Sequence, residues 1–235
     1  MLFHAAFMTI KLALVAICFG TIIGLFVAFA RIARSDNSNI VVRFFLALAR
    51  YLSLIYVTFF RGTPLFVQIF LWYFVWFPLF INPDHGLLIS GPLASEIRRD
   101  YGAVIAGCLA LSVNAGAYIT EIFRAGIQSI GKGQVEAARS LGLNYWQAMR
   151  YVILPQAIRR MLPPFGNEFI TLLKDSSLVS AISVAELAFT ARSMMGTYSR
   201  AEEPFYTISA VYLLMTMGLA FCFAWLEKKY KTPAH

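Results

Sequence analysis

The sequence predicts an all-α integral membrane protein with about five transmembrane helices. The chain has 235 residues, 59% of them hydrophobic, and a mean hydropathy of +0.68, whereas a soluble domain of this length needs far more polar surface. Five segments are apolar over the ~20 residues that a helix needs to cross a bilayer. Lysine and arginine are concentrated in alternate connections between those segments. Because the sequence has no internal repeat and no low-complexity linker, we expect a single transmembrane domain that covers residues 1–235.

The predicted spans are the apolar segments at residues 5–30, 51–80, 101–123, 162–193 and 205–226. The first segment is much longer than the apolar core of a signal peptide, and its basic residues follow it rather than precede it. We therefore expect a transmembrane helix here and not a cleaved signal peptide. It contains Gly20 and Gly24, a spacing that either lets a second helix approach closely or has no special role in a long membrane helix.

The second span carries two signs of a break. Pro64 removes a backbone hydrogen bond at mid-span, and Gly62 frees the chain beside it. Irregular backbone at membrane depth is tolerated only where it is buried in protein or lines a cavity. Arg61, Thr63 and Gln68 are therefore candidates to face a polar path.

The basic residues predict an N-terminus outside and a C-terminus in the cytosol. In this orientation the cytosolic side carries thirteen lysines and arginines, namely Arg31, Arg34, Arg43, Arg50, Arg124, Lys132, Arg139, Arg150, Arg159, Arg160, Lys228, Lys229 and Lys231. The outside carries five, namely Lys11, Arg98, Arg99, Arg192 and Arg200. A turn at Ser35–Asn39 then lies inside and a loop at residues 81–100 outside. The net charge of +8 follows from this bias, so no nucleic acid partner is expected.

No cofactor or metal site is predicted. Residues Gly126–Gly133 read GIQSIGKG and nearly spell a phosphate-binding loop. However, Gly133 replaces the serine or threonine that would hold magnesium, and the motif follows a transmembrane segment rather than a strand. Its glycines more simply end that helix and turn the chain. The cysteines lie in three different apolar segments and the histidines are scattered, which indicates neither a disulfide nor a metal site.

Residues 134–150 predict an amphipathic helix on the cytosolic side. Its apolar positions recur at three- and four-residue steps, at Val135, Ala138, Leu141, Tyr145 and Ala148. Gly142 interrupts this pattern at a cost of ~1 kcal/mol relative to alanine, which is useful where a helix bends or a partner comes very near. Leu154 and Pro155 are expected to stop the segment. From these residues alone, a helix lying on lipid headgroups and a helix docking onto a partner are both open.

Polar residues follow one side of the fourth span, namely Asn167, Glu168, Thr171, Lys174 and Asp175, with Ser176 and Ser177 just beyond. A charge near the bilayer centre costs ~2.5–3.5 kcal/mol on insertion scales, so these groups face a cavity or one another. Two explanations are open. Either the charges neutralise one another, or they form a path for a zwitterion, whose ammonium binds Glu168 or Asp175 and whose carboxylate binds Lys174 or a serine hydroxyl.

The third span has a polar face as well. Asn114, Tyr118 and Glu121 recur at i, i+4 and i+7, and we include them among the candidates for the path. Hydrogen bonding between helices is the alternative for Asn114 and Tyr118.

Several motifs together resemble one family. Within Gln134–Pro155 the residues Glu136, Ala137, Ala138, Gly142, Val152, Leu154 and Pro155 resemble the EAA signature of permease subunits of ABC importers. Val152 stands where the signature usually has isoleucine. The phrases FRGTPL (Phe60–Leu65), NAGAYITEIFRAGIQSI (Asn114–Ile130) and LPPFGNEFITLLKDSSLVS (Leu162–Ser180) resemble the polar amino-acid branch of that family, which includes histidine, glutamine and arginine permeases.

The resemblance implies a type I ABC importer (MetI-like) permease fold in the bacterial cytoplasmic (inner) membrane. It implies docking of the EAA helix, through Glu136, Ala137, Ala138, Gly142, Leu154 and Pro155, into a groove on an ATPase. The implied partners are a second permease subunit, identical or homologous, two cytosolic ATPase subunits, an extracytoplasmic solute-binding protein, and an amino acid as substrate. The chain itself would be no enzyme, because ATP hydrolysis belongs to the ATPase subunits.

The alternative function is that of a stand-alone secondary amino-acid carrier or channel. Such a protein needs no cytosolic partner and has a coupling-ion site in place of a docking helix. Five spans without an inverted repeat are a poor basis for a self-contained carrier. A membrane scaffold, a third class, leaves the intramembrane charges unexplained.

Overall fold

The computed structural model describes residues 1–32 and 40–230, and within these ranges the chain is helical apart from short turns and one isolated bridge between Ile81 and Ile89. The predicted turn at Ser35–Asn39, Arg34 and Lys231 lie outside the described residues. The elements in order are α1 (Leu2–Ile32), α2 (Ile40–Gly62), α3 (Leu65–Phe70), the π-helical η1 (Leu71–Trp76), α4 (Phe77–Phe80), α5 (Pro92–Gln128), α6 (Lys132–Ser140), α7 (Tyr145–Ala148), the π-helical η2 (Met149–Ile153), α8 (Leu154–Asp175), the 3₁₀-helical η3 (Ser176–Ile182), α9 (Leu187–Tyr198) and α10 (Glu202–Tyr230).

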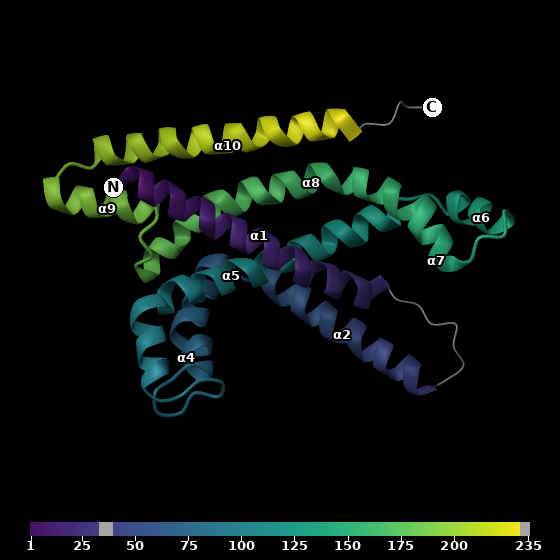
Figure 1. The fold of residues 1–235 in the computed structure, drawn as a ribbon, viewed down its shortest axis with the longest axis horizontal. Coiled ribbons are helices and arrows are strands. Elements are labelled where there is room, and N and C mark those ends of the chain that lie inside the picture. The colour runs from purple at the N-terminus through teal and green to yellow at the C-terminus, as the bar shows by residue number, and fades with distance from the viewer. Residues whose placement is uncertain (33–39, 231–235) are drawn as a thin grey trace.

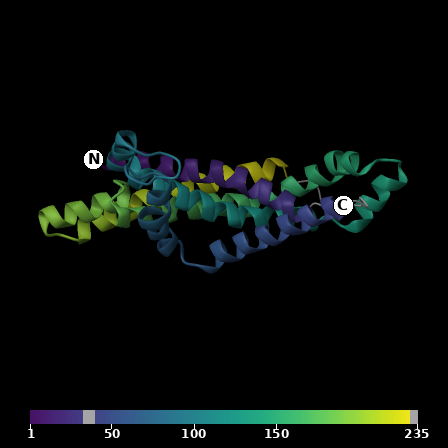
Figure 2. The same ribbon diagram turned by 90° about the horizontal axis from the view of Figure 1, so that it is seen from below.

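The expected five spans are confirmed. Among the described residues, α1, α2, α5 and α10 are each long and apolar enough to cross a membrane, and the bent pair Tyr145–Ile182 and Leu187–Tyr198, at 47°, makes the fifth. The molecule is elongated, with α6 and α7 projecting at one end and the turn from α9 to α10 at the other (Figures 1 and 2). We call these the α6 end and the α9 end. The N-terminus lies toward the α9 end, and α10 runs from the α9 end toward the α6 end (Figure 1).

The bounds of the second span differ most from the prediction. Helix α2 already begins at Ile40 and ends at Gly62, and Leu65–Phe80 is a separate, shorter helical segment instead of the second half of a span at 51–80. The apolar composition continues through Pro64, so hydropathy alone joins two segments that the backbone separates. The other helices extend past their apolar segments, because helical hydrogen bonding continues into the polar layer beyond the hydrocarbon.

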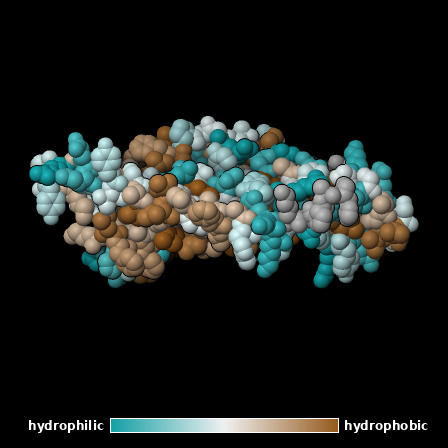
Figure 3. All heavy atoms as spheres, turned by 90° about the horizontal axis from the view of Figure 1, so that it is seen from above, coloured by the Kyte–Doolittle hydropathy of each residue, from teal (hydrophilic) through white to brown (hydrophobic). Residues whose placement is uncertain are grey.

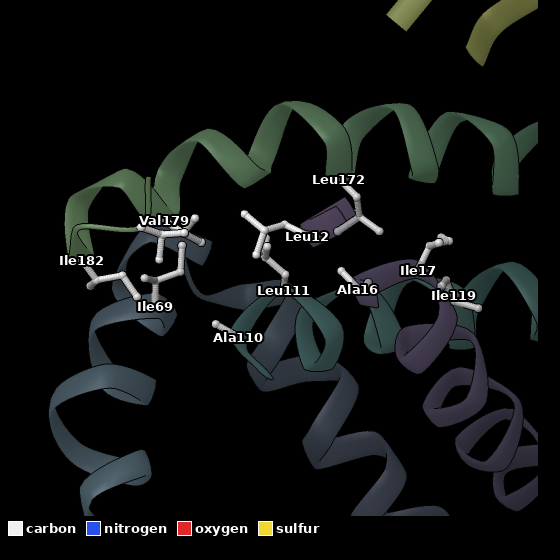
Figure 4. Close-up of a cluster of buried hydrophobic side chains, with 12 residues drawn as sticks. Leu12, Ala16, Ile17, Ile69, Ala110, Leu111, Ile119, Leu172, Val179 and Ile182 are labelled. Carbon is white, nitrogen blue, oxygen red and sulfur yellow. The ribbon is translucent and has the colours of Figure 1, made fainter. Parts of the chain in front are cut away.

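The core forms where α1 and α5 cross. Leu12 and Ala16 of α1, Leu111 of α5 and Leu172 of α8 are at most 1% exposed and point into one cluster (Figure 4). Gly20 and Gly24 allow this contact, because a Cβ on Gly24 would lie 2.8 Å from Cγ2 of Ile119. Of the two explanations for this glycine pair, close approach of a second helix is therefore confirmed.

Two of the spans are covered by little else in the chain. Only 11% of the apolar window of α2 and 6% of that of α10 is buried. Figure 3 shows hydrophobic residues gathered over the central and left parts of one face, with hydrophilic residues at the left end and over much of the right part. These helices therefore have large faces left for lipid or for another chain.

Candidate functional site

A group of hydrogen bonds replaces the helical bonds that Pro64 removes. Because Pro64 has no N–H, the carbonyl of Phe60 lacks its helical donor. The side-chain amide of Gln68 donates to this oxygen at 2.9 Å, and that of Asn114 donates to it at 3.0 Å. Gln68 also donates to the carbonyl and hydroxyl of Thr63, at 3.0 and 2.9 Å, and accepts from Asn114 at 2.9 Å. The break at Pro64 is thus satisfied by two amides, one of which comes from α5.

These contacts change the role expected for two candidates. Gln68 is fully buried and Asn114 is 6% exposed, so both serve the backbone of the broken helix and do not face an open path. For Asn114 this is the helix–helix hydrogen bonding that the sequence left open. Thr63 is half-buried and belongs to the same group.

We predict that Gln68→Leu destabilises the protein by about 1–3 kcal/mol, because the carbonyl of Thr63 loses its donor and the side-chain amide of Asn114 loses one of its acceptors. Thermal melting of the detergent-solubilised protein measures the change. Gln134→Leu, which removes an exposed amide on α6 that accepts from Gln156 at 3.4 Å, is the matched control and should melt as the wild type. Equal melting of the two variants would contradict this role for Gln68.

The predicted polar side of α8 is uncovered in the isolated chain. Asn167, Thr171 and Lys174 are exposed, while Glu168 and Asp175 are half-buried. The opposite side packs inward through Met161, Leu172 and Leu173, which are at most 6% exposed. Ser176 is fully buried and donates to the carbonyl of Leu173 at 2.8 Å, so it caps the end of α8; Ser177 is half-buried.

The break in the second span brings a cation close to this stripe. Arg61 is exposed at the last turn of α2. Its guanidinium lies over the ring of Tyr118, 5.1 Å from the centroid, a favourable cation–π geometry. Arg61 and Asp175 are both within electrostatic reach of Glu168. Groups from three elements, α2, α5 and α8, therefore share one polar environment.

Among the described residues, the stripe contains no direct ion pair. In residues 1–32 and 40–230 the ion pairs within 4.0 Å are Arg31–Glu121, Arg99–Asp100, Arg124–Glu121 and Arg200–Glu203. Lys174 and Glu168 are in none of them. Neutralisation over longer distances and binding of a ligand are therefore both open for these charges.

Glu121, another candidate for the path, is engaged within the chain. Its carboxylate pairs with Arg31 of α1 and with Arg124, the latter at 2.6 Å, and 17% of its side chain is exposed. It holds α1 to α5 near the α6 end instead of presenting a free charge.

The predicted docking helix is two helices joined by a tight turn. Gly142 has φ +80°, the left-handed region that favours glycine. The N–H of Gly142 donates to Arg139 O at 2.9 Å and that of Leu143 to Ala138 O at 3.1 Å. This is a Schellman motif, so α6 ends at Ser140. The expectation of one helix over residues 134–150, with Gly142 inside it, is therefore wrong. Asn144 then caps α7 in a reciprocal capping box with Gln147.

Pro155 does not stop the segment. The helical path continues from α7 through the wider turn of η2 into α8, and Pro155 lies at the start of α8 directly after that turn. At the other side, Gly131 caps the start of α6 after α5 has ended at Gln128. The expectation that the Gly126–Gly133 glycines end the helix is therefore wrong for two of them, because Gly126 lies inside α5, which ends at Gln128 with Ser129 as its C-cap, and Gly133 lies inside α6. Gly131 alone of the three lies in the connection between the two helices.

The residues predicted to dock are divided between two faces. Ala138 is 3% exposed and Val135 packs with Ile153 and Ala157, so this face of α6 is closed by the chain itself. Glu136, Ala137 and Gly142 are exposed, and Leu141 is 82% exposed. Leu154 is half-buried and Pro155 exposed. The surface free for a partner is therefore the outer face of α6 and its turn.

One acidic residue was missed by the sequence reasoning. Glu186 is fully buried and caps α9, accepting from the N–H groups of Phe189 at 2.7 Å and Ala188 at 2.9 Å. Its carboxylate also accepts from the hydroxyl of Tyr212 of α10 at 2.8 Å. A lone carboxylate within an otherwise apolar segment was the available signal. Glu186 joins α9 to α10 and supports the bend of the fourth span.

The fold and these groups define a class: a multi-pass helical membrane protein with a broken span, charges at membrane depth and a structured projection at one end, as expected of a transport protein.

Comparison with known proteins gives the same class. The family model described as "Binding-protein-dependent transport system inner membrane component" matches residues 20–232. The glutamine transport system permease protein GlnP of Escherichia coli (strain K12) is 35% identical over 231 residues, 98% of this chain and 93% of that protein. The probable amino-acid ABC transporter permease protein YckA of Bacillus subtilis (strain 168) is 38% identical over 94% of this chain and 85% of its own length.

Solved structures show the same fold. A crystal structure of an amino acid ABC transporter with histidines has a TM-score of 0.77 at 35% identity and covers 97% of this chain and 93% of that one. An inward-facing MetNI methionine ABC transporter has a TM-score of 0.73 at 21% identity, with coverage of 98% and 96%. The chain belongs to the family of binding-protein-dependent transport system inner membrane components. It is a transport component of the inner membrane with the MetI-like permease fold, and not an enzyme.

Proposed function

We propose that the chain is the permease subunit of an ATP-driven importer for a polar amino acid. It receives the amino acid from a solute-binding protein on the outside and is driven by ATPase subunits bound at the α6 end. The observation that carries this proposal is the uncovered stripe of α8, which presents an anion, Glu168, and a cation, Lys174, within otherwise apolar spans. A zwitterion needs both signs of charge.

The substrate is held between α8 and the break in the second span. The ammonium binds Glu168 or Asp175, and the carboxylate binds Lys174 or the guanidinium of Arg61. Arg61 is favoured because a guanidinium can donate two parallel hydrogen bonds to a carboxylate and because Tyr118 already orients it. Gln68 and Asn114 hold the break that places Arg61 there, and thus act as positioning residues.

A second permease subunit, identical or homologous, covers the stripe. Lys174 facing lipid near the bilayer centre costs ~2.5–3.5 kcal/mol on insertion scales, whereas facing a shared cavity it remains hydrated. The sparse burial of α10 and α2 leaves room for such a partner.

The outer face of α6 carries the contact with the ATPase. Glu136, Ala137 and the Gly142 turn are exposed there, and α6 is fixed to η2 and α8 through Val135 and Ile153. Force applied to α6 therefore reaches α8, the helix that bears the stripe, through a rigid apolar contact. The family names and the likeness to amino-acid permeases support this arrangement.

Uptake into proteoliposomes tests the proposal. The full chain, co-purified with its ATPase, is reconstituted and supplied with a solute-binding protein and a panel of radiolabelled amino acids. We expect uptake of at least one polar amino acid that depends on both ATP and the binding protein. Uptake by the chain alone, driven by an ion gradient, would establish the stand-alone carrier instead.

A further inference from the structure

A hollow outside the proposed transport path lies where the segment Leu71–Phe80 meets the beginning of α5. The ribbon of these two segments is at the lower left in Figure 1. Its volume is about 550 Å³. Its lining includes Tyr73, Phe77, Pro78, Ser95, Arg98 and Arg99. None of these residues takes part in the transport path described above.

The walls of the hollow are held in place. Phe77 is 3% exposed and packs on α5, where a Cβ on Gly102 would lie 3.4 Å from its ring. The loop between α4 and α5 is fastened by backbone hydrogen bonds, from Leu87 N to Leu79 O at 3.0 Å and from Gly91 N to Pro83 O at 2.8 Å. The shape is therefore present before any ligand arrives, and binding costs little ordering.

One of the two arginines that line the hollow has no ion pair among the described residues. Arg99 is paired with Asp100 at 2.8 Å. Arg98 has no ion pair within residues 1–32 and 40–230. Ser95 lies one turn before Arg98 on α5, so that its hydroxyl is on the same side of the helix. A guanidinium and a hydroxyl that line one hollow together with aromatic rings suit a phosphate group attached to an apolar body.

The sequence predicts that this part of α5 lies at the membrane surface. The apolar segment of this span begins at Tyr101, directly after Arg98–Asp100. With a rise of ~1.5 Å per residue, the Arg98 guanidinium belongs at the level of the lipid headgroups. Leu87 and Leu88 of the adjoining loop are 67% and 76% exposed, an apolar surface that fits contact with lipid better than contact with water.

We propose that this hollow binds the headgroup of an anionic phospholipid of the outer leaflet. Arg98 and Ser95 contact the phosphate, and the rings of Tyr73 and Phe77 with Pro78 contact the glycerol and the first acyl carbons. The bound lipid fastens the Leu71–Phe80 segment to α5 at the membrane surface. This site does not depend on the proposed substrate or on its path.

Native mass spectrometry of the purified full chain, incubated with phosphatidylglycerol, tests the proposal. We expect lipid adducts on the wild type and an occupancy lower by about tenfold or more for Arg98→Gln, since a charge-assisted hydrogen bond is lost. Lys11→Gln is the matched control, because it removes the same charge from an exposed position on α1, outside the hollow, and should retain the lipid as the wild type does. Thermal melting confirms that both variants are folded.

Two further measurements distinguish the occupant. Excess inorganic phosphate should leave the lipid adducts of the wild type in place, and its complete displacement of the lipid would overturn the proposal in favour of a free phosphate. Capture of the solute-binding protein should be equal for wild type and Arg98→Gln. If Arg98→Gln keeps the lipid occupancy of the wild type, the lipid site is overturned. If the same variant also captures less of the solute-binding protein, the hollow is assigned to an acidic protein surface instead.

Discussion

Glu168→Gln should lower substrate transport ten- to hundred-fold while the protein still folds and assembles. The substitution keeps the shape of the side chain and removes its charge. If the carboxylate binds the substrate ammonium, a charge-assisted hydrogen bond of ~1.5–3 kcal/mol is lost. Glu168 has no ion pair within the described part of the chain, so the folded state loses no salt bridge of its own. Uptake assays in proteoliposomes, run beside thermal melts, measure the two effects separately.

The control for this experiment is Glu202→Gln. Glu202 is exposed in the first turn of α10, far along the chain from the stripe, and its replacement should change neither transport nor melting.

The double change Glu168→Gln with Lys174→Met tests whether Glu168 and Lys174 only neutralise each other. If the two residues only balance each other, the single change lowers stability first and the double change restores it. A Glu168→Gln protein that melts normally and transports at the wild-type rate would exclude both roles.

Gly142→Val should uncouple ATP hydrolysis from transport. A β-branched residue at φ +80° is strained by about 1–3 kcal/mol, so the turn after α6 gives way and α6 changes its direction relative to α7. We expect coupled uptake to fall by about tenfold or more, since a displaced contact surface loses several interactions at once. The spans are not touched, because a Cβ at this position meets no described atom within 4 Å. The measurement is uptake per ATP hydrolysed in the reconstituted complex.

Gly142→Asn is the matched control, because asparagine tolerates the left-handed conformation. It should retain most of the coupling although it fills the same space as valine. If asparagine uncouples as strongly as valine, the partner requires the absence of a side chain and the turn geometry is not the cause. If valine leaves coupling intact, the Gly142 turn has no part in the contact with the ATPase.

Much of the architecture was predictable because the bilayer imposes simple rules. A span needs ~20 apolar residues whatever its neighbours are, so α1, α5 and α10 follow from composition alone. Pro64 and Gly62 predicted the break of the second span, since a missing N–H disrupts a helix in any context. The bounds of α2 were less accessible, because the apolar composition runs through the break.

The docking segment shows where local patterns mislead. Its three- and four-residue periodicity predicted one helix through Gly142 to residue 150, and all the apolar positions except Leu141 do lie on α6 or α7. However, the periodicity does not reveal that the hydrogen bonds of Gly142 and Leu143 close a turn. It also does not tell a face that packs on the chain itself, such as Val135 and Ala138, from one that is left for a partner.

The sequence by itself determined that this is a five-span inner-membrane transport protein with charges on α8, because hydropathy, charge bias and motif spacing are properties of the chain in one dimension. Only the tertiary structure decided which polar residues are buried and hydrogen-bonded within the molecule. Gln68 and Asn114 meet across 46 residues, and Asn114 reaches Phe60 across 54. A buried polar group must find a partner wherever the fold provides one, and the sequence order contains no record of that proximity. The same packing leaves Arg61 and Lys174 exposed, and both belong to the substrate site that we propose.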